Sequence, residues 1–142
     1  MILKYLLIFS ILFSLYACRV STKQDVAVGI NDIKNDSIKQ HHFLEPMYYD
    51  PYFPKPLVDE AKGILITLCF KIETQKPKTN KEFLVLTQEA TESFNQLDAK
   101  FMSQGSELET VAREAIAMDM EYIAKMYGFQ ENIETLIENR EW

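Results

Sequence analysis

Three long stretches of this chain space their apolar residues three and four positions apart, which is the repeat of one helix face. The repeat is clearest between Phe83 and Phe101, where core-type residues follow each other at four, three, four, three and four positions. Such a seam is typical of helices packed side by side. Only four glycines occur in 142 residues, which disfavours a turn-rich β-sandwich or barrel. The sequence therefore predicts an all-α fold, a small bundle of three to four helices.

We expect the helices of this bundle over about residues 56–74, 81–104, 107–127 and 131–139. Thr79 or Asn80 can cap the second helix through a side-chain oxygen. Ser106 and Glu109 have the spacing of a capping box, which would start the third helix at residue 107. Gly128 is well placed to end that helix. The folded domain is expected to cover residues 46–142.

The first 17 residues have the character of a signal peptide, with Lys4 at the start and an apolar core over about residues 6–15. This core is too short to span a bilayer comfortably. It ends in Leu15-Tyr16-Ala17-Cys18, which resembles the lipobox of bacterial lipoproteins, although Tyr16 stands where a smaller residue is usual. We therefore predict cleavage before Cys18 and lipidation of its sulfur, with palmitate among the acyl chains. An ordinary secretory signal and an uncleaved anchor are the alternatives.

Lipidation of Cys18 would hold the mature protein on a membrane without a transmembrane helix, because two or more acyl chains suffice for stable anchoring. This predicts a location in the bacterial cell envelope. Arg19 follows the cysteine, in place of an aspartate. By analogy with enteric sorting, this permits delivery to the outer membrane, and the expected location is the outer membrane or the periplasmic face.

The stretch from Cys18 to residue 45 is polar, rich in Asn and Asp, and has no sustained helical or strand period. It is interpreted as a flexible tether with a root-mean-square reach of roughly 30 Å. His41 and His42 lie near its end without a third ligand nearby, so neither is expected to bind a metal.

An aromatic arm follows the tether over residues 46–56, where four prolines exclude a regular helix. Two interpretations remain open for this arm. It either lies on the core of the domain as an extended segment, or exposes an aromatic lip that contacts a partner. The residues of that possible contact are Tyr48, Tyr49, Tyr52 and Phe53, with Arg113 from the third helix.

The chain carries a formal net charge of −6, which argues against nucleic acid as a partner and against binding to anionic lipid through a basic patch. Four glutamates make the C-terminal segment acidic: Glu131, Glu134, Glu138 and Glu141. Such a run is usually a solvated face, and the alternative is a surface that meets a basic protein partner.

Candidates for acid–base chemistry are confined to the third helix, where Glu114 and Asp119 lie close in sequence. Asp119 falls beside the apolar stripe, and a carboxylate near a core can have a raised pKa. The alternative is a structural hydrogen bond. Cys69 lies in an apolar run and is expected to be a buried thiol. No motif for a phosphate, metal or redox cofactor occurs, so no cofactor is predicted.

Four separated segments give this chain a resemblance to an uncharacterised bacterial family, DUF5713. They are Tyr49-Asp50-Pro51-Tyr52-Phe53-Pro54-Lys55, Thr110-Val111-Ala112-Arg113-Glu114, Tyr122-Ile123-Ala124-Lys125-Met126-Tyr127-Gly128-Phe129 and Asn139-Arg140-Glu141-Trp142. The resemblance covers about residues 48–142 and implies a small helical protein. It implies no activity, cofactor or catalytic residue.

Three functions are compatible with these features. The first is a membrane-anchored interaction module that binds a protein or peptide. The second is a small envelope enzyme that uses Asp119 and Glu114 as acid and base, which requires a pocket beside both residues. The third is a purely structural envelope lipoprotein.

Overall fold

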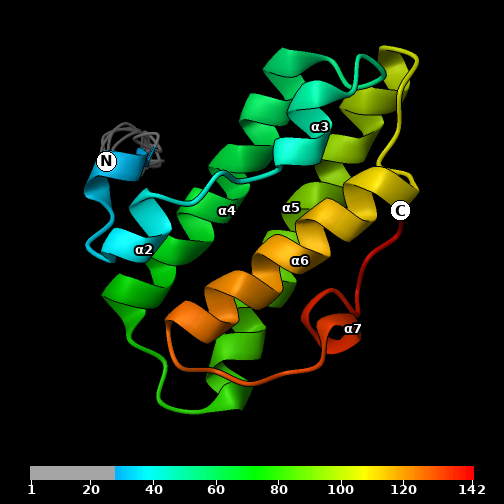
Figure 1. Ribbon diagram of the computed structural model, residues 1–142. Coiled ribbons are helices and arrows are strands. Elements are labelled where there is room, and N and C mark those ends of the chain that lie inside the picture. The colour runs from blue at the N-terminus through cyan, green and yellow to red at the C-terminus, as the bar shows by residue number, and fades with distance from the viewer. Residues whose placement is uncertain (1–27) are drawn as a thin grey trace, which may run out of the picture.

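The structure is a computed structural model that describes residues 28–142. The expected signal peptide, Cys18 and the tether as far as residue 27 lie outside the described residues (Figure 1).

The described residues form only helices and connections, so the predicted all-α fold is confirmed. Three long helices build the bundle, α4 (Lys55–Gln75), α5 (Asn80–Ser103) and α6 (Thr110–Met126). α4 and α5 form an antiparallel pair, and α6 lies across them (Figure 1). The shorter elements are η2 (Ile30–Asp32), α2 (Asp36–Lys39), α3 (Glu45–Tyr49) and α7 (Ile133–Leu136). None of the described helices is both long and apolar enough to cross a bilayer.

The ends of the α4–α5 hairpin follow from local chemistry. Lys76, the residue after α4, adopts the left-handed conformation with φ of 51°, and Pro77 then prevents a further helical turn. Thr79 caps α5 by accepting a hydrogen bond from the Glu82 amide at 3.2 Å. Gly105, with φ of 76°, turns the chain away after α5.

The predicted start of the third helix is wrong by three residues, because the capping box at Ser106 and Glu109 does not form. The Leu108 amide instead donates to the Asp98 carboxylate on α5 at 2.7 Å, and the Leu108 side chain is buried. This pairing keeps the chain outside the helix until Thr110. The predicted fourth helix is also shorter than expected, since only Ile133–Leu136 is helical.

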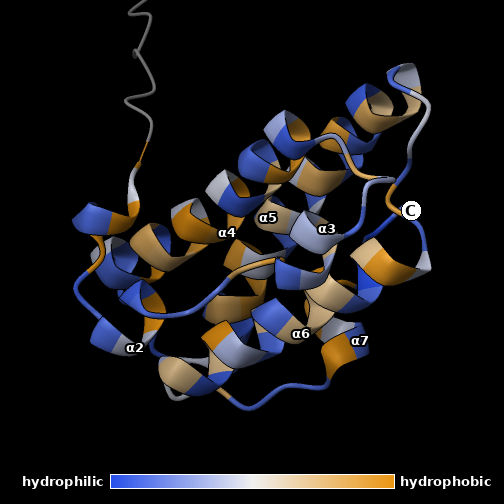
Figure 2. Ribbon diagram, turned by 45° about the horizontal axis from the view of Figure 1, so that its top comes forward, coloured by the Kyte–Doolittle hydropathy of each residue, from blue (hydrophilic) through white to orange (hydrophobic). Residues whose placement is uncertain are grey.

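Residues 28–45 are folded against the bundle, which corrects their interpretation as a flexible tether. Ile33, Ile38, Phe43 and Leu44 are almost completely buried. Three of these are five positions apart, a spacing that matches neither a helix face nor a strand face, because the segment winds over α4 and α6 in short turns. The folded domain therefore includes residues 28–45 as well as 46–142. Figure 2 shows this segment crossing the bundle before α3.

The aromatic arm also differs from expectation, since its first residues form the short helix α3. Pro46 occupies the first turn of α3, where a missing N–H costs no hydrogen bond. Met47 and Phe53 are buried in the core. The Lys55 ammonium donates to the backbone carbonyls of Met47 and Asp50 at 3.1 and 2.9 Å. These contacts hold the arm on the bundle.

Candidate functional site

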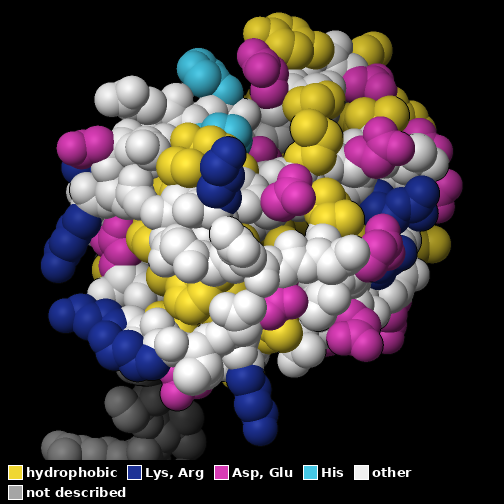
Figure 3. All heavy atoms as spheres, turned by 60° about the horizontal axis from the view of Figure 1, so that its bottom comes forward, with side chains coloured by type: hydrophobic (Ala, Val, Ile, Leu, Met, Phe, Trp, Pro, Cys, Tyr) yellow, Lys and Arg dark blue, Asp and Glu magenta, His cyan; other side chains and the backbone are white. Residues whose placement is uncertain are grey.

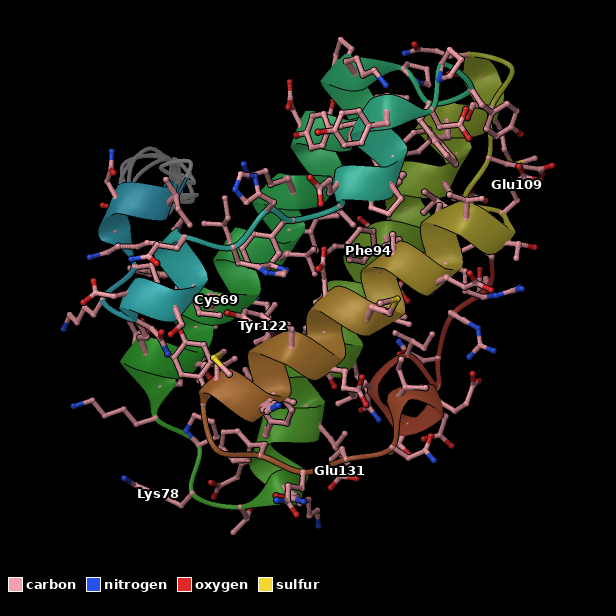
Figure 4. The ribbon with its side chains drawn as sticks, viewed as in Figure 1. Cys69, Lys78, Phe94, Glu109, Tyr122 and Glu131 are labelled. Atoms are coloured by element: carbon pink, nitrogen blue, oxygen red, sulfur yellow. The ribbon has the colours of Figure 1, made fainter. Side chains whose placement is uncertain are left out.

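A hollow of about 650 Å³ opens beside the C-terminal half of α6. Its size lies in the range of small-ligand sites. Tyr122 on α6 and Glu131 in the connection to α7 line it from two sides, and both are labelled in Figure 4. The other lining residues are His41, Met118, Asp119, Glu121, Ala124, Lys125, Phe129 and Gln130. Figure 3 shows histidine, carboxylate and apolar side chains together in the upper half of this end of the molecule.

His41 and Asp119 form a hydrogen-bonded pair at one wall of the hollow. The distance from His41 Nε2 to Asp119 Oδ1 is 2.7 Å. When the carboxylate is ionised it can only accept, and His41 Nε2–H is then the donor. The second carboxylate oxygen accepts from the Leu44 amide at 2.7 Å. The imidazole stacks on Tyr122 with ring centroids 4.0 Å apart and meets the edge of Phe43. Asp119 thus fastens the segment of His41 and Leu44 to α6.

Burial raises the pKa of Asp119 above its ordinary value, and the hydrogen bonds from His41 and Leu44 only partly offset this effect. Among the described residues, His41 Nδ1 has no hydrogen-bond partner, so this nitrogen is available to solvent or a ligand. The pair resembles the histidine–carboxylate arrangements that orient an imidazole in enzymes.

The predicted combination of Glu114 with Asp119 does not form. Glu114 is exposed on the outer face of α6 and does not line the hollow, whereas Asp119 is 8 % exposed and contacts His41. A pocket therefore exists beside one of the two proposed acid–base residues only.

The outer face of α6 is a stripe of apolar and charged side chains, with two glutamates and one lysine. We call it the α6 stripe and define it as Val111, Glu114, Met118, Glu121 and Lys125, which recur at helical spacing. Met118 is 64 % exposed and Val111 is 38 % exposed. Met118 and Glu121 also line the hollow, so the stripe leads directly into it.

The possible partner contacts of the aromatic arm are only partly available. Tyr49 is 80 % exposed and Tyr52 is 37 % exposed. Phe53 is buried, and the Tyr48 hydroxyl donates to Asp59 at 2.6 Å. Arg113 is half-buried, and none of the ion pairs among residues 28–142 includes it. The structure does not bring these five residues together with the hollow.

A second polar cluster, which sequence reasoning missed, holds the start of the described chain. The Glu73 carboxylate on α4 accepts hydrogen bonds from the amides of Lys34 and Asn35 and from the Tyr127 hydroxyl. Burial alone would raise the pKa of Glu73, but these bonds lower it below its ordinary value. The cluster joins residues that lie up to 93 positions apart between Lys34 and Tyr127, so no local pattern could reveal it.

Cys69 lies behind this cluster and is fully buried, as expected from its apolar neighbours. Desolvation raises the pKa of its thiol to about 12, and the Glu73 charge adds to this shift. Such a thiol is a poor nucleophile, so Cys69 is a core side chain. In the part of the chain that the structure describes, no three His, Cys, Asp or Glu side chains gather as metal ligands.

The fold and this site define a small all-α domain with a ligand-sized hollow beside one helix. The chain belongs to the family of unknown function DUF5713, whose model matches residues 37–142. The match includes His41 and Asp119, so both residues of this hydrogen-bonded pair lie within the family domain. No curated protein and no solved structure matches the chain.

Proposed function

We propose that this protein is a lipid-anchored interaction module of the bacterial envelope, which binds a basic protein partner through the α6 stripe and the adjoining hollow. The observation that carries the proposal is the exposure of Met118 between the carboxylates of Glu114 and Glu121, next to the hollow. A large apolar side chain at the centre of a polar rim is the usual anatomy of a docking surface.

Charge complementarity supports a basic partner. Residues 28–142 contain 20 Asp and Glu residues against 12 Lys and Arg residues. A negative field of this kind accelerates the approach of a positively charged protein and disfavours acidic ones. Buried contact with Met118 and the hollow would then supply the apolar part of the affinity.

The proposed anchor would hold this surface close to the membrane. Nine residues separate Cys18 from Val28, where the described domain begins. A chain of this length spans at most about 35 Å when fully extended. A fully extended tether of residues 19–45 would span about 100 Å, so the domain would operate closer to the bilayer surface than that longer tether allows.

Mass spectrometry of the mature N-terminus tests the anchor. We expect a first residue corresponding to Cys18 that carries acyl chains, and we expect Cys18→Ser to release the protein into the soluble fraction. An unmodified cysteine, or cleavage at another position, would remove the anchor from the proposal while leaving the docking surface untouched.

Site-specific photo-crosslinking in intact cells tests the docking surface. A photoreactive residue at position 118 should yield one discrete adduct, and Glu114→Lys should weaken it. Position 102 is the matched control, because Met102 is 61 % exposed but lies at the end of α5, away from the hollow. Equal adducts from both positions, or none from either, would contradict a docking role and favour a structural lipoprotein.

A further inference from the structure

We infer that the hollow beside α6 is a recognition site for one Lys or Arg side chain of the partner. This inference rests on the proposed function and names the group that the site would select. Such a side chain combines an apolar stem with a cationic tip, so it needs an apolar floor beside carboxylates.

The hollow supplies an apolar floor. Its lining includes the buried Ala124, the exposed Met118 and the rings of Tyr122 and Phe129. Phe129 is held in place because it stacks on Phe83, with ring centroids 4.3 Å apart and planes 4° from parallel. One face of Phe129 is thus covered by the core, while the residue still borders the hollow. A fixed aromatic ring at such a border favours a cation near its exposed face.

Two of the three carboxylates that line the hollow, Glu121 and Glu131, are available to a cation, whereas Asp119 already contacts His41 and Leu44. Among residues 28–142, Glu121 takes part in no ion pair. Glu131 accepts one neutral hydrogen bond, from the Asn80 side-chain amide at 2.6 Å, which leaves its charge uncompensated. Glu121 comes from α6 and Glu131 from the connection to α7, so the two negative charges lie on different elements around the same space.

Lys125 is the cation that already borders this space, and it forms none of the ion pairs among the described residues. Its ammonium would repel an incoming Lys or Arg tip. The site therefore predicts effects of opposite sign from two neighbouring substitutions on α6. Glu121→Gln should weaken the binding of a cation, and Lys125→Gln should strengthen it.

The test is an NMR titration of the mature full chain in nonionic detergent micelles with N-acetyl-arginine N-methylamide. The citrulline analogue is the control ligand, because it has nearly the same shape without the charge. We expect amide shifts at Tyr122, Phe129 and Glu131, with at least tenfold weaker binding of the citrulline analogue. Glu121→Gln should weaken binding of the arginine ligand at least threefold, and Lys125→Gln should tighten it.

Glu107→Gln is the matched control variant, because Glu107 is an exposed carboxylate that does not line the hollow. It should leave the titration unchanged. Equal binding of both ligands, shifts that map to another face, or equal effects of the Glu107 and Glu121 substitutions would overturn the inference. A position-118 crosslink that persists alongside such a result would show that the docking surface exists but does not select a cationic side chain.

Discussion

Asp119 is the residue whose two oxygens join two parts of the chain, since one contacts His41 and the other contacts the Leu44 amide. We predict that Asp119→Ala lowers the free energy of unfolding by about 2 kcal/mol, because it leaves the buried Leu44 N–H without an acceptor. Urea denaturation of the mature chain measures this effect.

Asp119→Asn is the second variant to measure, because its amide oxygen can still accept from the Leu44 amide. Its NH2 group can donate to His41 Nε2 in the tautomer that carries the ring hydrogen on Nδ1. It also removes a carboxylate whose pKa is raised by burial, and that ionised group opposes folding at neutral pH. We therefore expect a loss under about 1 kcal/mol. Equal losses for Ala and Asn would show that the hydrogen bonds of Asp119 contribute little.

The Glu73 carboxylate makes the free energy of unfolding of the domain depend on pH. Its folded pKa is lower than its unfolded pKa, so its contribution is present above the unfolded value and is lost as the pH falls through the folded value. We predict that Glu73→Gln destabilises the protein at pH 7 and that the gap from the wild type narrows below about pH 4. Urea midpoints measured across this range provide the test, and a constant gap would contradict it.

The segment of residues 28–45 is an element of the fold, although its sequence has the composition of a linker. We predict that Ile38→Ala costs about 3 kcal/mol, because Ile38 is completely buried in α2. Lys39→Ala, at the exposed next position, is the control and should cost less than about 0.5 kcal/mol. Thermal or urea unfolding distinguishes the two. A harmless Ile38→Ala would restore the interpretation of a flexible tether.

α4 contains a glycine in its interior that the packing does not require. A Cβ added at Gly63 would meet no atom within 4 Å, and the residue is already helical. We predict that Gly63→Ala stabilises the domain by about 0.5–1 kcal/mol, since alanine loses less backbone entropy in a helix. Thermal melting followed by circular dichroism measures the gain. A lower melting temperature would mean that Gly63 has a packing role in the protein.

At the scale of the whole molecule, the excess of carboxylates creates self-repulsion in the folded state. Added salt screens charges on the surface, so we predict that raising NaCl from about 20 to about 200 mM increases the melting temperature by a few degrees. A control titration with a neutral osmolyte of equal osmolality separates screening from general solvent effects. A melting temperature that falls with salt would show that attractive ion pairs dominate the surface.

The sequence by itself was sufficient to predict the long helices, because the apolar repeats and caps that specify them are local. The apolar repeat from Phe83 to Phe101 and the caps at Thr79 and Gly128 act over a few neighbouring residues, which a linear reading can detect. The same reading placed Asp119 beside the core, which the structure confirms. The matching segments were likewise sufficient to recognise the family.

Only the tertiary structure decided where the remaining residues belong, because their partners are distant in the chain. His41 meets Asp119 across 78 positions, and nothing near either residue signals the other. Ser106 has the sequence context of a helix cap, but the Leu108 amide donates to Asp98 of α5 and so the helix does not start there. Residues 28–45 lack a regular period because their buried side chains follow the surface of the bundle and not one face of a long helix or strand. Local patterns specify helices, and long-range contacts specify the hollow.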